Sequence, residues 1–181
     1  RVAFGMEVRI TVPGGGAELP RGEHGEISLR GPQIMLGYWN QRELTEAAFC
    51  HGWLCTGDGG YMDEDGFVYL TDRVKDMIVS GGENVYSREV ENAVYKHPAV
   101  KDCSVIGIPS EEWGEAVHAV VVFKEGGSAS YEEILEHCRS YLAGYKCPRS
   151  MEVRDALPLS GAGKPLKAEL RAPYWRTAET V

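Results

Sequence analysis

Apolar and polar residues alternate with a period of two in short segments of the first 72 residues. The pattern predicts strands at GMEVRITV (5–12), GEISLRG (25–31) and GFVYL (66–70), separated by turns. Glycine is frequent between them, and only QRELTEAAF (41–49) has the spacing of a helix. We therefore expect this part of the chain to be rich in β-structure.

From residue 73 onward, helical and extended patterns are mixed. In SREVENAVYKHP (87–98) the apolar residues have helical spacing, and the sequence predicts Ser87 as the N-cap and Pro98 as the stop. Two segments dominated by β-branched residues, CSVIGIP (103–109) and AVHAVVVF (116–123), predict strands.

A second helix is predicted within residues 128–148. Ser130 and Glu133 have the spacing of a capping box, and Gly144 stands where a C-terminal cap is expected. The apolar residues that share one face of this helix are Ile134, Cys138, Tyr141 and Leu142. The chain is therefore expected to have an α+β fold in two units, joined around residues 72–76.

Composition limits the classes of protein. With 181 residues and 43% hydrophobic content, the chain can build one ordinary core or two small ones. It contains no apolar run of about 20 residues, so no transmembrane segment is expected, and the N-terminus lacks the pattern of a signal peptide. The five cysteines have no CxxC spacing, which indicates neither a zinc site nor a disulfide framework and favours a cytoplasmic location.

The net charge of −8 argues against a nucleic-acid partner. The sign reverses within residues 139–176, where eight basic side chains face three acidic ones. Such a segment on an acidic protein suggests a small polyanion as ligand, although a solvated surface with scattered cations has the same composition.

The first candidate site is the segment Thr56-Gly57-Asp58, which is followed fourteen residues later by Asp72-Arg73. A carboxylate after a small turn can accept two hydrogen bonds from the hydroxyls of a ribose, and an arginine can donate to the sugar or to a phosphate. The alternative is structural: Asp58 caps a turn and Arg73 makes a surface ion pair.

The second candidate is Lys164, at the end of the pattern P-x-x-x-x-G-K over residues 158–164. A flexible Ser-Gly-Ala-Gly loop can carry an ammonium group to a phosphate and a carboxylate held together. The loop is not a Walker A motif, because its leading glycine is missing and Pro165 follows the lysine. The alternative is an ordinary mobile loop before a C-terminal helix.

The third candidate combines aromatic rings with cations. Trp113 lies beside a glycine, and Tyr145, Lys146 and Arg149 follow one another closely. Rings and cations together can hold a nucleotide with several phosphates. Taken alone, Trp113 is better explained as a partly buried anchor at the start of a strand, so the prediction depends on the joint pattern.

Several motifs in a fixed order resemble the adenylate-forming superfamily, which includes acyl- and aryl-CoA ligases, luciferases and the adenylation domains of peptide synthetases. They are GEISLRGPQIMLGYW, GWLCTGD, GFVYLTDRVKDMIVSGGENVY, EVENAVYKHPAV, WGE, YKCP and LPLSGAGK. The resemblance covers nearly all 181 residues, and KDMIVSGGENVY is similar to the acyl-CoA ligase branch.

The resemblance implies two domains. Residues 1–72 would be the C-terminal, β-rich part of the large AMP-binding domain, where the strands belong to a distorted barrel. Residues 73–181 would be the mobile, small α+β C-terminal domain, with a short sheet flanked by helices and a hinge near residue 75. The phosphate loop and the YGxTE-like segment of the family are absent from the sequence, and Arg1 begins within a motif. We therefore expect the C-terminal portion of a longer enzyme, inactive without its large domain.

The implied reaction has two steps. A carboxylic acid and ATP with Mg²⁺ give an acyl-adenylate and pyrophosphate, and the thiol of CoA then displaces AMP. By resemblance, Asp58 would bind the ribose hydroxyls, Arg73 would assist at the same nucleotide, and Lys164 would bridge the carboxylate and the α-phosphate. Lys75 matches the hinge position. No metal ligand is expected in this chain, because those for Mg²⁺ would lie in the large domain.

The resemblance also implies a surface for CoA. Gly81, Gly82 and Glu83 match the segment that lines the pantetheine passage, and Trp113, Tyr145 and Arg149 fall near the surface for the CoA nucleotide. Cys147 departs from the pattern, since some relatives carry arginine there.

The implied substrate is a medium- or long-chain fatty acid, with aryl acids as the second choice. Two other functions remain open: a module that binds CoA or pantetheine without chemistry, and a luciferase-like or carrier-loading enzyme. The sequence predicts no oligomeric state.

Overall fold

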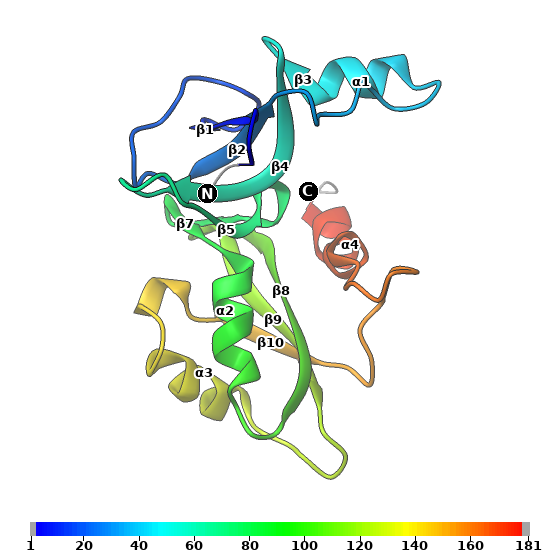
Figure 1. The fold of residues 1–181 in the computed structure, drawn as a ribbon. Coiled ribbons are helices and arrows are strands. Elements are labelled where there is room, and N and C mark those ends of the chain that lie inside the picture. Colours follow the sequence, from blue (N-terminus) through cyan, green and yellow to red (C-terminus); the bar gives the residue numbers. More distant parts are fainter. Residues whose placement is uncertain (1–2, 179–181) are drawn as a thin grey trace. The chain divides into compact units, whose positions relative to one another are not determined.

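The computed structural model describes residues 3–178 of the chain and the side chains of residues 3–175. The chain divides into two compact units, Arg1–Lys75 and Asp76–Val181 (Figure 1). The α+β class expected from the sequence is confirmed. That the second unit moves as a domain stays a prediction.

The first unit is built on one antiparallel sheet. Its strands pair in the order β1-β2-β4-β3, and β5 pairs with the other part of β4. A small core forms from Ile10, Ile27 and Met62. The elements are β1 (Glu7–Thr11), β2 (Gly25–Arg30), α1 (Arg42–Ala48), β3 (Phe49–Cys50), β4 (Trp53–Met62) and β5 (Val68–Arg73).

The second unit contains a mixed sheet with the strand order β10-β9-β6-β7, and β8 pairs with β9. All pairs are antiparallel except β10 with β9. The short helix η1 (Val74–Asp76) spans the boundary between the two units. The elements of the second unit are β6 (Ile78–Ser80), β7 (Glu83–Val85), α2 (Ser87–Tyr95), β8 (Val100–Ser110), β9 (Gly114–Phe123), α3 (Tyr131–Arg139), η2 (Gly144–Lys146), β10 (Ser150–Val153) and α4 (Lys167–Ala178).

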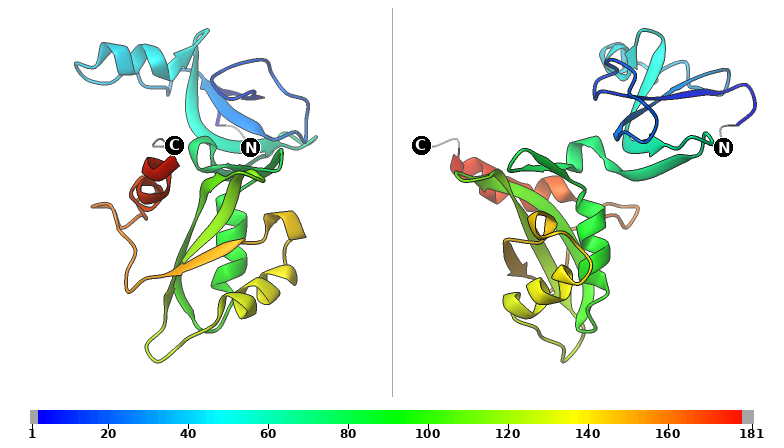
Figure 2. Two further views of the ribbon diagram at one scale, coloured as in Figure 1. Left: turned by 180° about the vertical axis from the view of Figure 1, so that it is seen from behind. Right: turned by 90° about the vertical axis from the view of Figure 1, so that its left-hand side faces the viewer.

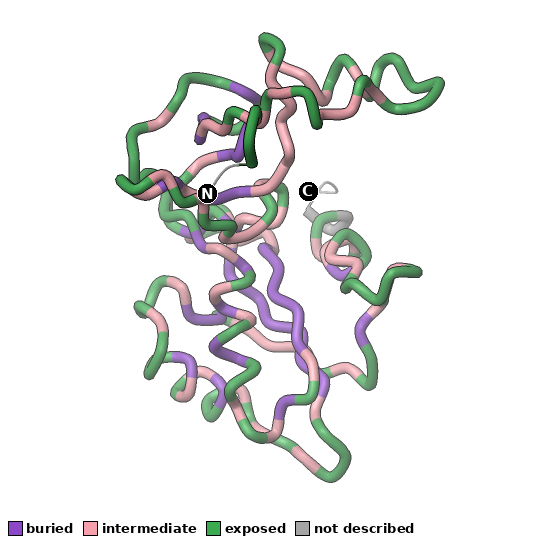
Figure 3. Tube along the Cα trace, in the orientation of Figure 1, coloured by how far each residue is buried: buried purple, intermediate pink, exposed green. Residues whose placement is uncertain are grey.

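Strand β9 supplies residues to two cores, because alternate side chains point to opposite faces of a sheet. Val117 and Val121 pack with α2 and α3, whereas Val120 and Val122 pack with Leu170 of α4. The helices therefore cover both faces (Figure 2), and the buried residues concentrate on β8 and β9 (Figure 3). Each fully buried valine of this kind contributes about 1.5–3 kcal/mol.

Two helix caps differ from the prediction, and one is confirmed. The capping box of α3 is present: Ser130 Oγ accepts from Glu133 N at 3.2 Å, and Glu133 Oε2 accepts from Ser130 N at 2.7 Å. The N-cap predicted at Ser87 is wrong by one residue: Tyr86 is the N-cap, and the Ser87 hydroxyl accepts from Lys167 Nζ instead. The C-cap predicted at Gly144 is also wrong, because α3 ends at Arg139 and Gly144 begins η2.

No helix within residues 3–178 combines the length and the apolar character needed to cross a membrane.

Candidate functional site

Strands β4 and β5 place Asp58 directly opposite Arg73. Arg73 Nε lies 3.4 Å from Asp58 Oδ1, and the two side chains remain 54% and 40% exposed, respectively. The structure therefore brings the two predicted nucleotide-binding residues together and leaves both accessible to a ligand.

The turn expected before Asp58 is wrong, because residues 56–58 lie within β4, where the pairing with β2 shifts register and Gly57 has a φ of +71°. A buried carboxylate that was not predicted from the sequence supports this irregular segment. Glu26, which is 4% exposed, accepts from Gly57 N at 2.8 Å and from Gly14 N at 2.7 Å. Two hydrogen bonds to backbone amides compensate the cost of burying the charge. Asp58 N in turn donates to Thr56 Oγ1 at 3.1 Å, so the segment 56–58 is held from both sides. The sequence offered one indication of this buried carboxylate: Glu26 stands next to Ile27 in a segment predicted to be a strand.

Lys164 closes a small turn. Ser160 N donates to Lys164 O at 2.8 Å, Lys164 N donates to Ser160 Oγ at 3.1 Å, and Gly163 N donates to Ser160 O at 2.8 Å. Leu159 and Pro165 form a bridge across the base of the turn. These contacts give the turn a defined backbone, and the Lys164 side chain is exposed. That the loop is flexible stays a prediction.

Gly81, Trp113 and Arg149 come together at one end of the second sheet. Gly81 and Gly82 form the β6–β7 turn with φ of +61° and +84°, which suits a type I′ hairpin. Gly81 N donates to Trp113 O at 2.9 Å. Arg149 Cζ lies 3.8 Å from the centroid of the Trp113 ring, which is the geometry of a cation–π contact. An aromatic ring, a cation and an exposed glycine turn thus form one surface.

Glu83 and Tyr145 lie outside that stack. Glu83 is exposed at the start of β7, opposite Ser80. Tyr145 is 39% exposed in η2, and its aromatic ring lies 5.8 Å from Lys146 Nζ. Among the contacts of residues 3–175, none joins Tyr145 to Trp113 or Arg149.

Cys147 faces the core instead of the surface. It is 3% exposed and packs with the residues under α2 and α3, and burial raises the pKa of its thiol. A charged arginine could not occupy this position without moving to the surface.

Lys75 lies in η1 and is exposed as the last residue of the first unit. Asp76, the next residue, forms an ion pair with Arg171 of α4. Asp76, the first residue of the second unit, is therefore anchored to α4 directly after the predicted hinge at Lys75.

Most cations of the basic segment, residues 139–176, are paired within the protein. The segment therefore does not form a single binding surface for a polyanion. Five of its eight basic side chains form ion pairs: Arg139 with Glu136, Lys146 with Glu89, Arg154 with Glu152, Lys167 with Glu91, and Arg171 with Asp76. Arg149 stacks on Trp113, and the side chain of Arg176 lies outside the described residues. Lys164 has no ion-pair or hydrogen-bond partner for its ammonium group among the described side chains, which distinguishes it from its neighbours.

A polar network joins α4, the helix that follows Lys164, to strands β9 and β10. The network was not predicted from the sequence. The Tyr174 hydroxyl donates to Glu152 Oε2 at 2.7 Å, so His118 Nε2, 3.0 Å away, donates to the same hydroxyl. His118 Nδ1 then accepts from Ser150 Oγ at 2.7 Å. Burial lowers the pKa of His118, while burial and the Glu152 carboxylate raise the pKa of Tyr174 to about 12.

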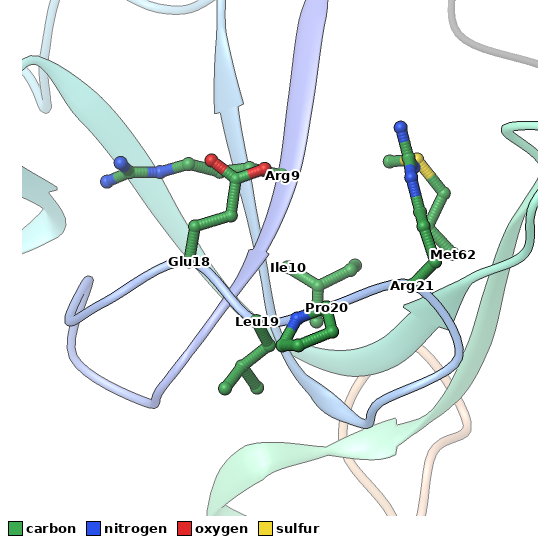
Figure 4. A pocket seen from close by; sticks show the side chains of 7 residues that line it. All are labelled: Arg9, Ile10, Glu18, Leu19, Pro20, Arg21 and Met62. Carbon is green, nitrogen blue, oxygen red and sulfur yellow. The ribbon is translucent and has the colours of Figure 1, made fainter.

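The first unit contains a pocket of about 200 Å³. In Figure 4, Arg9 and Glu18 lie on one side of it, and Arg21 and Met62 lie on the other. None of the predicted site residues lines the pocket. Within residues 3–175, no group of three or more His, Cys, Asp or Glu side chains is arranged to hold a metal ion.

Comparison with protein families shows that residues 89–164 match the AMP-binding enzyme C-terminal domain. A feruloyl-CoA synthase of Amycolatopsis sp is 47% identical over 172 residues, which cover 95% of this chain and 35% of that protein. A long-chain-fatty-acid–CoA ligase of Bacillus subtilis is 51% identical over 148 residues, or 82% of this chain and 26% of that protein. The chain thus spans about a third of the length of these relatives, or less.

Solved structures agree with this similarity. The o-succinylbenzoate CoA synthetase MenE of Bacillus subtilis, in complex with its acyl-adenylate intermediate, superposes with a TM-score of 0.85 and 41% identity. The match covers 92% of this chain and 34% of MenE. ATP-bound MatB of Rhodopseudomonas palustris gives a TM-score of 0.84 and 38% identity, covering 94% of this chain and 34% of MatB.

Proposed function

Since the chain belongs to the adenylate-forming superfamily, with residues 89–164 in its AMP-binding enzyme C-terminal domain, we propose that it is part of an AMP-forming acid–CoA ligase. One observation carries the proposal most directly. Lys164 presents an exposed ammonium group on a closed turn, in a segment where five of eight cations are neutralised internally.

In the first half-reaction, a carboxylate oxygen of the acid attacks the α-phosphorus of ATP, and pyrophosphate leaves. Negative charge accumulates where the two anions meet, and Lys164 neutralises it there without a proton transfer. In the second half-reaction, the thiolate of CoA attacks the acyl carbon, and AMP leaves as the acyl–phosphate bond breaks.

Asp58 and Arg73 bind the nucleotide in this proposal. The carboxylate accepts hydrogen bonds from the ribose hydroxyls, while the guanidinium donates to the sugar or the α-phosphate. Their register across β4 and β5 supports a shared role, as does the support of Gly57 by the buried Glu26. When bound, Mg²⁺ supplies charge neutralisation at the phosphates, and we assign it no ligand in this chain.

The passage for the pantetheine arm would be lined by Gly81, Gly82 and Glu83. The Trp113–Arg149 stack would hold the CoA nucleotide. A ring and a planar cation on an exposed surface suit an adenine and its phosphates. Tyr145 is assigned to the same ligand by resemblance alone. The burial of Cys147 in the core supports a CoA surface that does not use this position.

The two half-reactions use two surfaces of the second unit. Lys164 directly precedes α4, on the sheet face opposite to α2 and α3, whereas the Trp113–Arg149 stack lies where β9 and β10 begin. We propose that rotation at Lys75 brings these surfaces in turn to one reaction centre on the large domain.

That large domain is the partner we propose. The first unit has a small core and several exposed large apolar side chains. Their exposed fractions are 101% for Leu36, 100% for Phe4, 87% for Trp39 and 70% for Leu70. Exposed apolar side chains in such numbers mark a contact surface. We propose that they pack against the rest of an AMP-binding domain, in a cytoplasmic enzyme whose five cysteines are free thiols.

We propose a fatty acid as the substrate, by similarity to the long-chain-fatty-acid–CoA ligase at 51% identity. An aryl acid is the second candidate, because the feruloyl-CoA synthase is 47% identical over a longer part of the chain. A screen of fatty and aryl acids on the full-length protein, by AMP release, distinguishes them. If free CoA did not accelerate AMP release, a luciferase-like or carrier-loading enzyme would replace the ligase.

The proposed function is tested by ATP–pyrophosphate exchange on a full-length protein that contains this chain. Lys164→Gln is expected to lower the exchange rate by about 10²–10³-fold, the usual loss when a charge-stabilising group is removed. Thioester formation from supplied acyl-AMP is expected to remain. Lys101→Gln, at an exposed lysine of β8, is the matched control and should change neither rate.

Unchanged exchange in Lys164→Gln would contradict the role of this lysine. CoA binding with no exchange even in the unaltered full-length protein would favour a binding module without chemistry. The 181-residue chain alone is expected to show no exchange above background, and measurable turnover would contradict the need for the large domain.

A further inference from the structure

Cys50 and Cys55 lie in one hairpin of the first unit. Strands β3 and β4 are joined by His51 and Gly52, whose φ values are +50° and +79°, and Cys50 pairs with Trp53. Since side chains two residues apart share a face, Cys55 points to the same face as Trp53 and Cys50. The two thiols are therefore diagonal neighbours on one surface of the hairpin.

The backbone of Gly15 lies against both thiols. A Cβ atom added to Gly15 would lie 2.9 Å from Cys55 Sγ and 3.0 Å from Cys50 Sγ. Two atoms this near one point are at most about 6 Å apart, so rotation about the Cα–Cβ bonds and a small shift of the exposed hairpin tip would bring the sulfurs into contact. Both cysteines are partly exposed, whereas Cys103, Cys138 and Cys147 are buried.

We propose that Cys50 and Cys55 form a redox-active dithiol that closes reversibly to a disulfide when a small-molecule disulfide, such as oxidised glutathione, supplies the oxidation. The Cys50 thiolate attacks one sulfur of the small disulfide, and one thiol molecule leaves. Cys55 then loses its proton to solvent and attacks Cys50 Sγ, the mixed disulfide breaks, and a second thiol molecule leaves. The two cysteines together lose two hydrogens, and one small disulfide is reduced to two thiols.

The surroundings favour this order of attack. Burial raises the pKa of Cys55, and the nearby Glu26 carboxylate adds to the effect, which disfavours Cys55 as the first nucleophile. A closed disulfide would cross-link β4 three residues before Asp58. The neighbouring Gly57 is already held by Glu26, so oxidation would restrict a segment that is anchored on its other side.

The test uses the 181-residue chain, incubated at mildly alkaline pH with increasing ratios of oxidised to reduced glutathione. After an acid quench, unfolding and alkylation, tryptic peptides are weighed. Residues 43–73 contain no internal lysine or arginine, so Cys50 and Cys55 stay in one peptide, and the other three cysteines fall in separate peptides. We expect the 43–73 peptide to lose two hydrogens and to escape alkylation, while the peptides of Cys103, Cys138 and Cys147 are alkylated.

Cys50→Ser and Cys55→Ser are the matched variants. In each, the remaining cysteine has no partner and is expected to stop at a mixed disulfide with one glutathione. The proposal is overturned if the unaltered chain, folded by circular dichroism, carries two glutathiones on the 43–73 peptide. It is equally overturned if both thiols remain reduced at every ratio while a small dithiol peptide in the same mixture oxidises.

Discussion

At Gly81, the absence of a side chain allows the indole of Trp113 to lie against the backbone. An added Cβ would come within 2.8 Å of Trp113 Cε3, closer than such atoms can approach. Gly82, the other residue of the turn, has nothing within 4 Å of the same position. Both have a positive φ, so the two glycines differ in the space around them.

This difference yields a paired prediction. Gly81→Ala and Gly82→Ala share the cost of a side chain at positive φ, but only Gly81→Ala must also displace Trp113. We expect the free energy of unfolding to fall by about 1–3 kcal/mol more in Gly81→Ala, the usual cost of overpacking. Urea denaturation followed by tryptophan fluorescence measures the free energy of unfolding of both variants. Equal losses in this free energy would show that Trp113 moves aside freely.

Single residues were predictable from the sequence where a local motif surrounds them, and not where distant partners define them. The exposed Lys164 and the Gly81-Gly82 turn stand in such motifs, whereas the functional roles assigned to them stay predictions. The role of Glu26 depends on amides 12 and 31 residues away, and that of His118 on hydroxyls 32 and 56 residues away. Such contacts exist only after folding, so no spacing in the sequence reveals them.

At the scale of elements, α4 combines one apolar cluster on the sheet with polar contacts to other elements. Leu170 is its one fully buried apolar side chain among residues 167–175. Lys167 pairs with Glu91 at 2.7 Å, with both side chains less than 15% exposed, and Trp175 Nε1 donates to Gly107 O at 3.2 Å. The element that directly follows Lys164 is thus held in place by partnered charges and hydrogen bonds.

The buried pair gives the second prediction. Lys167→Met removes the cation, and among the described residues the largely buried Glu91 carboxylate then keeps its hydrogen bond from Val105 N alone. We expect a loss of about 3–5 kcal/mol in the free energy of unfolding, since an uncompensated buried charge is costly. Arg139→Met, which breaks an exposed pair with Glu136, is the control and should cost less than about 1 kcal/mol in the same chemical denaturation. Similar losses would show that water reaches Glu91.

The third prediction concerns pH. Burial and the Arg154 guanidinium lower the pKa of His118, outweighing the opposite effect of the Glu152 carboxylate. Because the folded chain binds this proton less readily, the unfolded chain binds more protons as the pH falls below the ordinary histidine pKa of about 6.5. Stability is therefore expected to decrease with falling pH from about 6.5 down to the lowered pKa of His118.

His118→Gln removes this titration, so the free energy of unfolding should depend less on pH. Urea denaturation between about pH 7 and 5.5 measures the difference. His97, whose pKa is also lowered by burial, remains in both chains, so the difference between them isolates His118. Arg154 and Tyr174 lower the pKa of Glu152, so its contribution is lost only at more acidic pH. Parallel curves for the two chains would contradict the prediction.

Elements were predictable where the periodicity is long. Strands β8 and β9 and helix α3 follow from β-branched runs and from the capping box. Strand β10 was missed because four residues carry too little pattern, and its parallel pairing with β9 is set by the tertiary fold. Ser87 was misjudged as a cap because Lys167, eighty residues later, competes for its hydroxyl.

At the scale of the whole molecule, the chain has separate cores. The core of the first unit contains only residues before Lys75, and both cores of the second contain only residues after Asp76. Each unit can therefore keep its packing when the backbone torsions between them change. This independence supports, in the proposed enzyme, a rotation concentrated at Lys75.

The fourth prediction rests on that proposal. In the full-length enzyme, Lys75→Pro would fix φ at Lys75 and is expected to reduce thioester formation at least about tenfold more than adenylation, an energetic difference of about 1.4 kcal/mol. Lys75→Ala removes the charge but leaves the torsion free, and should preserve both rates. Single-turnover assays of the two half-reactions measure the effect, and equal losses in Lys75→Pro would argue against the hinge.

The shared strand β9 has a consequence for how this part of the protein can change over time. Its odd-numbered valines Val117 and Val121 and its even-numbered valines Val120 and Val122 belong to different cores. An insertion or deletion of one residue within β9 would exchange both sets at once and disrupt both layers of helices. Substitutions of similar volume on one face, by contrast, leave the other face untouched. Related chains are therefore expected to differ in β9 by replacement and to keep its length constant.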